Sequence, residues 1–162
     1  MGGARGTLHL PLPLLLTLLL GLGAASGQGD TPYLRVTGND GDELLELSLE
    51  DKPCWVVQCN HSVTGVLVSD YYRLDGREMM LTDSHTPAFD AGLGHIPGRG
   101  RLESDDNHGY WIRDIDEAVP GNGYFLRVGS LEVDHRIVHG DDSYSLSQMA
   151  AHQRVRIEVV WK

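Results

Sequence analysis

Histidines and cysteines are the side chains of this 162-residue chain best suited to chemistry. Cys59 and His61 are two residues apart, so on an extended strand they share one face and offer two ligands to a soft metal ion. His85 and His95 stand at either end of a stretch rich in glycine and proline, where they could converge. Two ligands do not close a metal site, so the sequence favours ordinary surface histidines. A periplasmic metal-binding protein that uses these four residues is the alternative.

His61, Ser62 and Asp70 have the residue types of a hydrolase triad. Adjacent residues on a strand point to opposite faces, however, so His61 and Ser62 would not hydrogen-bond to each other. The Gly-x-Ser-x-Gly motif that exposes a catalytic serine is absent from the sequence. We therefore expect a protein that is not an enzyme, and the sequence indicates no cofactor.

The only two cysteines, Cys54 and Cys59, are five positions apart. On an extended strand this spacing separates their Cα atoms by about 16 Å, whereas a disulfide needs about 4.4–6.8 Å. An odd spacing also places the two side chains on opposite faces. An oxidising compartment would favour a disulfide if the segment bends, so both redox states stay open.

Residues 1–27 have the order of a secretory signal peptide: a basic Arg5, an apolar run over 10–22 and small residues over 23–27. The apolar run is shorter than the roughly 18–20 residues that a membrane-spanning helix needs. We expect cleavage after Gly27, which leaves one exported domain over residues 28–162. The expected location is periplasmic or secreted.

The predicted mature chain is strongly acidic, with 12 basic and 23 acidic residues and a formal charge of −11. Such a chain repels phosphate backbones, so nucleic acid is a poor partner. Anionic membrane surfaces are disfavoured for the same reason, and we expect no membrane association after signal cleavage. The remaining length is typical of a single domain with a real core.

The pattern that must position these side chains is the two-residue alternation of strands, as in Leu45, Leu47 and Leu49. Runs of this kind, or short apolar runs, cover residues 33–36, 45–49, 55–60, 66–74, 79–82, 110–112, 124–128, 131–138 and 155–161. The sequence therefore predicts an all-β fold, either a small antiparallel β-sandwich or a partly closed barrel.

Turn residues set the predicted connections. Asp75-Gly76 and Gly129-Ser130 are typical of hairpin turns between neighbouring strands. Glycine and proline over 85–100 predict a long loop. We expect at most one short helix, within 143–152, with Ser145 or Ser147 as its cap.

Acidic residues gather in four short segments, which are 39–42, 105–107, 114–117 and 140–142. Oxygen-rich turns can bind calcium, but none of these matches the twelve-residue EF-hand loop. Aspartate and asparagine also bond to backbone groups in turns, so the sequence favours a structural role.

Three segments resemble the bacterial family called domain of unknown function 1850. They are Gln58–Val63 with its His-Ser-Val run, Val68–Leu74, and Phe89–Pro97 with a Gly-x-Gly loop; the resemblance extends over His61–Trp161. Members are exported and often encoded beside tripartite periplasmic transporters of the TAXI type. The resemblance implies an accessory role in periplasmic solute uptake, with a transporter component or a small molecule as partner.

A site can be placed on these segments. If His61 ends a strand and the Phe89–Pro97 loop folds over it, a polar recess results. We expect this recess to bind a small ligand or a partner's backbone, because glycines permit close approach. Its predicted residues are His61, Ser62, Asp70, Tyr72, Phe89, Gly92 and Gly94. The alternative is that Gly92 and Gly94 only shape a tight turn.

Overall fold

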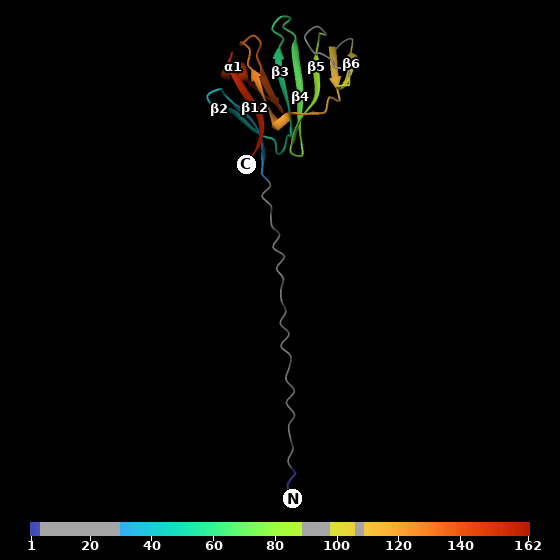
Figure 1. Ribbon diagram of the computed structural model, residues 1–162, viewed down its shortest axis with the longest axis vertical. Helices are drawn as coiled ribbons and strands as arrows, with labels where there is room; N and C mark the ends of the chain where they lie inside the picture. The colour runs from blue at the N-terminus through green and yellow to red at the C-terminus, as the bar shows by residue number, and fades with distance from the viewer. Residues whose placement is uncertain (4–29, 89–97, 106–108) are drawn as a thin grey trace.

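The computed structural model describes residues 1–3, 30–88, 98–105 and 109–162, and these form two antiparallel β-sheets (Figure 1). The smaller sheet has the order β2-β1-β12-β9. Its strands are β1 (Pro32–Thr37), β2 (Glu43–Ser48), β9 (Gly123–Arg127) and β12 (Arg154–Trp161). The predicted signal peptide lies, from residue 4 onward, outside the described residues.

The larger sheet has the order β11-β10-β3-β4-β5-β7-β6. Its strands are β3 (Cys54–Asn60), β4 (Leu67–Asp75), β5 (Glu78–Thr86), β6 (Arg101–Asp105), β7 (Gly109–Arg113), β10 (Arg136–His139) and β11 (Asp142–Ser145). A two-residue strand, β8 (Glu117–Ala118), also pairs with β5. Both sheets stay open, so the all-β prediction is confirmed as a sandwich rather than a partly closed barrel.

The core lies between the two sheets, where the alternating apolar residues point. Leu34 and Ile157 of the small sheet and Ile137 of the large sheet are fully buried. Each such side chain contributes roughly 1.5–3 kcal/mol by leaving water. An aromatic stack crosses the core, with ring centroids 5.7 Å apart for Trp55 and Tyr72 and 5.8 Å apart for Tyr72 and Tyr124.

One predicted hairpin and the predicted short helix are confirmed. The run from β3 through β4 to β5 is an antiparallel meander, and Gly76 takes a positive φ of 58° in the turn after Asp75. The helix α1 (Leu146–Ala150) begins after Ser145, whose hydroxyl accepts the N–H of Gln148. It is the only α-helix in the described ranges, and a 3-10 turn, η2 (Pro120–Asn122), precedes β9.

The hairpin predicted at Gly129-Ser130 is wrong. β9 pairs with β12 in the small sheet, whereas β10 pairs with β3 in the large sheet, so the chain crosses from one layer to the other here. Asp134 takes a positive φ of 45°, which interrupts the extended run expected over 131–138. Two bonds hold the crossing instead: the Gly129 N–H donates to Nδ1 of His135, and the His135 N–H donates to the Ser147 hydroxyl.

The loop predicted over 85–100 begins later than expected, because His85 and Thr86 belong to β5. Residues 89–97 of this loop lie outside the described residues. No helix in the described ranges is both long and apolar enough to cross a bilayer.

Candidate functional site

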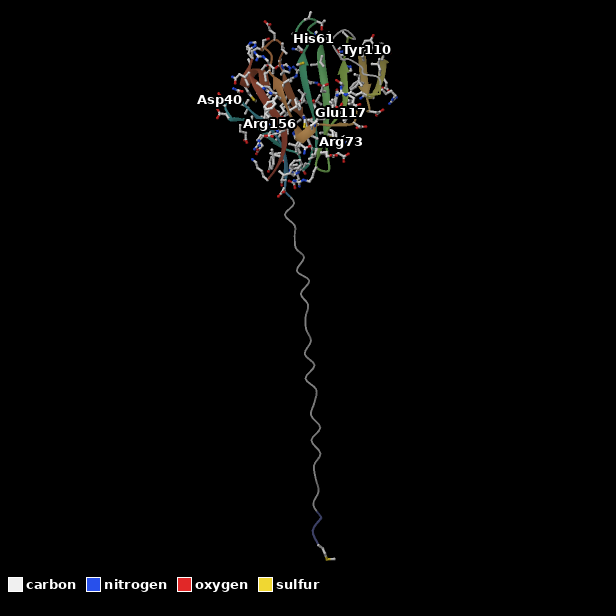
Figure 2. The ribbon with its side chains drawn as sticks, viewed as in Figure 1. Asp40, His61, Arg73, Tyr110, Glu117 and Arg156 are labelled. Carbon is white, nitrogen blue, oxygen red and sulfur yellow. The ribbon has the colours of Figure 1, made fainter. Side chains whose placement is uncertain are left out.

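His61 and Ser62 lie in the loop that joins β3 to β4, at one end of the sandwich (Figure 2). The N–H of Thr64 donates to Nδ1 of His61 at 3.3 Å, while Ser62 is exposed. Together with the loop over 130–133, this turn lines a cavity of about 390 Å³. The two residues therefore share one site, although on a loop rather than on a strand.

Asp70 and Tyr72 lie apart from that loop, on the inner face of β4. Asp70 is half-buried and accepts the hydroxyl of Ser84, which faces it from β5. Tyr72 is buried in the aromatic stack. The structure thus brings together His61 with Ser62 and Asp70 with Tyr72, as two separate pairs. The other predicted recess residues, Phe89, Gly92 and Gly94, lie outside the described residues.

The interior around Asp70 shifts the acid–base behaviour of three side chains. Burial raises the pKa of Asp70, and the Ser84 hydrogen bond and the charge of Arg99 offset only part of that effect. Burial also raises the pKa of Tyr72 to about 12 and that of Tyr124 well above 10. This region therefore favours neutral groups.

Two of the predicted metal ligands, Cys59 and His85, lie on different strands and opposite faces of the large sheet. Cys59 lies on the inner face of β3, and burial raises the pKa of its thiol. His85 lies on the outer face of β5, where its ring is 4.3 Å from that of Trp111. No three His, Cys, Asp and Glu side chains converge in the described part of the chain, and His95 falls outside it. Cys54 and Cys59 are both free thiols and point to opposite faces of β3.

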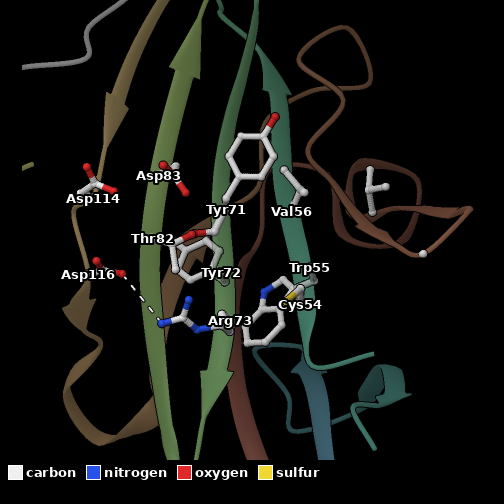
Figure 3. Close-up of a pocket in the computed structure, with 12 residues that line it drawn as sticks. Cys54, Trp55, Val56, Tyr71, Tyr72, Arg73, Thr82, Asp83, Asp114 and Asp116 are labelled. Carbon is white, nitrogen blue, oxygen red and sulfur yellow. Dashed lines mark hydrogen bonds and ion pairs between the residues drawn. The ribbon is translucent and has the colours of Figure 1, made fainter. Parts of the chain in front are cut away.

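A groove of about 400 Å³ lies on the outer face of the large sheet (Figure 3). We call it the outer groove. One side is apolar and aromatic, formed by Val56, Val138 and Tyr71 from three neighbouring strands. The opposite side carries Asp114 and Asp116 from the segment between β7 and β8. The remaining lining residues are Cys54, Trp55, Tyr72, Arg73, Thr82, Asp83 and Gly140.

A local irregularity in β4 and β5 builds the groove. The register shifts between Tyr71 and Tyr72, and the hydroxyl of Thr82 donates to the Tyr71 carbonyl at 3.2 Å. The Ile115 N–H donates to the Thr82 carbonyl at 2.8 Å and holds the segment that carries Asp114 and Asp116 in place. We call these two aspartates the acidic wall. An irregularity of this kind, a β-bulge, bends a strand and changes the direction of its side chains, which is why β-bulges recur beside binding sites.

Backbone conformations in and beside the acidic wall are unusual. Asp114 and Asp116 both have positive φ, at 55° and 42°. Gly100 packs against this segment with φ +69°, and a Cβ there would lie 2.7 Å from the Arg113 carbonyl oxygen. Positive φ is uncommon outside glycine, and aspartate is one of the few other residue types that adopt it, so the two residues suit the turn that holds their carboxylates at the groove.

The groove carboxylates are loosely paired. Asp83 lies 3.6 Å from Arg113 and Asp116 lies 3.9 Å from Arg73, both longer than a hydrogen bond. Asp114 has a closer partner, Arg101 at 2.8 Å. Asp83 and Asp116 therefore keep acceptor capacity for another donor.

Aromatic rings continue the outer face beside the groove. The rings of Tyr71 and Trp111 lie 5.3 Å apart, and the guanidinium of Arg113 lies 3.4 Å from the centre of the Trp111 ring. None of these three residues was among the predicted site residues. The one available signal was the acidic segment 114–117, which we interpreted as a turn.

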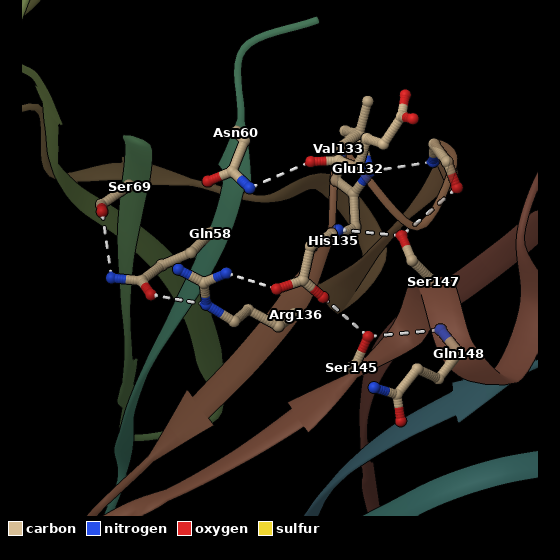
Figure 4. A network of polar contacts seen from close by, with 12 residues as sticks. Gln58, Asn60, Ser69, Glu132, Val133, His135, Arg136, Ser145, Ser147 and Gln148 are labelled. Carbon is tan, nitrogen blue, oxygen red and sulfur yellow. Dashed lines mark hydrogen bonds and ion pairs between the residues drawn. The ribbon is translucent and has the colours of Figure 1, made fainter. Parts of the chain in front are cut away.

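A polar network supports the neighbouring strands (Figure 4). Arg136 donates to Gln58 and to Asp134, and Ser145 donates to the second oxygen of Asp134. The Ser145 hydrogen bond and the Arg136 guanidinium hold the pKa of Asp134 below its usual value. Burial lowers the pKa of His135, which suits its role as an acceptor through Nδ1.

A family model described as domain of unknown function (DUF1850) matches residues 56–146. The match covers more than half of the chain. It runs from β3, whose Val56 lines the apolar side of the outer groove, to the start of α1. No curated protein and no solved structure matches the chain significantly. The resemblance found in the sequence is confirmed, and the chain belongs to the DUF1850 family.

Proposed function

We propose that this chain is an exported, non-enzymatic binding module that holds a small ligand in the outer groove. It serves a tripartite transporter as an accessory component of periplasmic solute uptake. The observation that carries the binding role is the groove itself, a concave site of about 400 Å³ with an apolar side and convergent polar groups. Membership of the DUF1850 family supports the transporter context, through the gene neighbourhood that the resemblance implies.

The chemistry of the groove indicates the kind of ligand. An apolar body would pack on Val56, Val138 and the Tyr71 ring, which offers an electron-rich face. An ammonium or another strong donor would bond to Asp83 and Asp116, whose present partners lie beyond hydrogen-bond distance. An organic cation fits both sides at once, because a cation over a tyrosine ring gains a further attraction.

The composition of the lining supports binding over catalysis. The described residues that line the groove include carboxylates, a guanidinium and the Cys54 thiol, but no imidazole. A serine or cysteine nucleophile needs a base within hydrogen-bond reach. His61 and Ser62 lie instead in the β3–β4 loop, where the Thr64 N–H already donates to the histidine Nδ1.

Binding is tested by following backbone amide resonances during titration with putrescine, arginine, glutamate and succinate. We expect saturable shifts at Tyr71 and Thr82 with the cationic probes putrescine and arginine, and not with the anionic probes glutamate and succinate. Asp83→Asn and Asp116→Asn should each weaken that binding roughly tenfold, because each removes one charge-assisted hydrogen bond. Asp40→Asn, an exposed aspartate outside the groove, is the control and should bind normally. No saturable binding, or equal binding by all variants, overturns the proposal.

Export and the transporter role have their own measurements. The protein recovered from the cell envelope or the medium should begin at Gln28, as determined by mass spectrometry of the intact chain. Deleting the gene should lower uptake of the transporter's solute, and the wild-type gene should restore it. Uptake that is unchanged by the deletion would remove the accessory role and leave the binding measurement unaffected.

A further inference from the structure

A basic and aromatic surface lies on the outer face of the small sheet, opposite in character to the outer groove. Phe125 of β9 is 54 % exposed. The guanidinium carbon of Arg154 lies 3.9 Å from the centre of the Phe125 ring, and that of Arg156 lies 5.4 Å away. Arg127 follows on the same face of β9, two residues after Phe125. We call these four residues the β9 surface.

The positive charges of the β9 surface are poorly compensated. Arg156 is paired with Glu158 at 2.7 Å, but that carboxylate also accepts Arg35 at 2.8 Å. Arg127 and Arg154 have no ion pair in the described part of the chain, and they face each other directly across β9 and β12. Like charges in such cross-strand positions are destabilising. In a chain with 23 acidic and 13 basic residues, this local excess of positive charge favours the binding of an anionic partner.

The same surface borders an unpaired strand edge. β9 is the last strand of the small sheet, and no described strand pairs with its other side. An edge strand presents backbone N–H and C=O groups to any extended chain that lies beside it. Extended peptides bind proteins in this way, and neighbouring side chains select among them.

Charge argues against a second copy of this chain as the occupant. Antiparallel pairing of two β9 strands would bring their arginines together on one face, without adding a carboxylate. An added strand from a different protein with acidic residues would instead place carboxylates beside Arg127. It would also bring them toward the guanidinium of Arg154, which extends from β12 over the Phe125 ring of β9. An apolar residue of that strand would cover Phe125.

We propose that β9 binds an extended acidic segment of a partner protein as an added strand. Arg127 and Arg154 take its carboxylates, and Phe125 packs against one of its apolar side chains. This site is separate from the outer groove, so it stands whether or not the groove binds a ligand.

The test uses a fluorescent seven-residue peptide of alternating glutamate and valine, with the glutamine–valine peptide for comparison. Fluorescence anisotropy should show that the glutamate peptide binds at least tenfold more tightly, and that raising the salt concentration to about 0.5 M weakens it. Arg127→Gln with Arg154→Gln should remove that preference. Lys52→Gln, which removes a positive charge from an exposed loop position, should keep it. Equal binding of both peptides overturns the proposal.

Two further probes separate strand addition from simple charge attraction. A glutamate–valine peptide that is N-methylated at alternate residues keeps its charges but loses its ladder donors, and it should bind at least tenfold more weakly. Binding that is unaffected by N-methylation overturns the added strand. Phosphatidylserine vesicles should not bind, and vesicle binding that depends on Arg127 and Arg154 would replace the peptide with an anionic lipid surface.

Discussion

The outer faces of the two sheets carry opposite chemistry on a single sandwich. On the large sheet, Tyr71 lies beside a wall of aspartates whose arginine partners are 2.8–3.9 Å away. On the small sheet, the guanidiniums of Arg154 and Arg156 lie over Phe125, and of these two only Arg156 has a carboxylate partner among the described residues, Glu158. A net charge of −10 therefore describes neither face. Summed charge informs solubility, whereas recognition depends on how strands place the charges.

The two faces also differ in the state of the backbone behind them. The outer groove is built from a register shift between β4 and β5 and from aspartates at positive φ. The β9 surface is a regular antiparallel pair with unbroken register from Arg127 to Gly123. We expect the groove to be shaped for a compact ligand, and the β9 surface to suit an extended one.

The largest effect should come from the core that both faces share. Ile157 of β12 is fully buried, and Ile157→Ala should lower the free energy of unfolding by about 2–5 kcal/mol. Val160→Ala, on the outward side of the same strand, should cost less than about 1 kcal/mol. Urea unfolding followed by tryptophan fluorescence measures both. Similar losses for the two variants would contradict the assignment of Ile157 to the core and of Val160 to the outer face of the small sheet.

A second prediction compares the two faces of the large sheet. Asp70 points inward and Asp83 outward, and burial raises the pKa of Asp70. Asp70→Asn should therefore raise the free energy of unfolding at pH 7 by about 1 kcal/mol, because it removes a charge from a poorly solvated position. Asp83→Asn should change it little.

The pH dependence gives the sign of the Asp70 effect. In the folded chain this carboxyl keeps its proton to higher pH than in the unfolded chain. The stabilisation that this gives the folded state is complete in acid, below the unfolded pKa of about 3.9. That contribution is lost as the pH rises through the raised pKa. The advantage of Asp70→Asn should shrink toward zero in acid. An advantage that is constant from pH 3 to pH 8 would contradict this explanation.

A third prediction concerns the crossing between the two sheets. Burial lowers the pKa of His135, and its Nδ1 accepts the Gly129 N–H only when that nitrogen is unprotonated. Stability should be full above about pH 6.5 and should fall as the pH drops below it, because the unfolded chain binds the proton more readily. The amide of Gly129 should then exchange faster with solvent. His135→Gln should flatten this part of the pH profile, and an unchanged profile would disprove the role of His135.

The smallest effects should come from the exposed ion pairs of the two faces. Arg156→Gln removes a 2.7 Å pair with Glu158 and should cost roughly 0.5 kcal/mol. Asp116→Asn removes a 3.9 Å contact with Arg73 and should leave the melting temperature unchanged. Thermal unfolding at low and high salt measures both variants. A larger loss for Asp116→Asn would show that the acidic wall is structural and would weaken its assignment to ligand binding.

Local patterns predicted the elements well. Alternation located β2 and β12, a short extended-looking run located β1, and the Asp75-Gly76 turn identified the β4–β5 hairpin. Ser145 was one of two serines proposed as the helix cap, and its hydroxyl makes that bond. These features depend on neighbours in sequence, so residue type and spacing are enough to find them.

Long-range pairing was not predictable in the same way. Gly129-Ser130 has good hairpin chemistry, but the strands beside it enter different sheets, because β12 and β3 offer the buried partners. The predicted recess joined His61 to Asp70, which the structure places in a loop and on an inner strand face. The outer groove depends on the pairing of β7 with β5, and no short sequence pattern predicts that pairing.

The sequence by itself determined most of the strands, the short helix and the family of this protein, because each is encoded in side-chain periodicity, capping residues or motif spacing. The short strands β6, β8 and β11 were not predicted. Only the tertiary structure decided which charges meet. Arg127 faces Arg154 through the register of two strands distant in sequence. Asp83 and Asp116 line the same groove because β7 and β8, on either side of Asp116, both pair with β5. Charge is a property of each residue, whereas its compensation depends on distance, and distance is set only when the sheets pack.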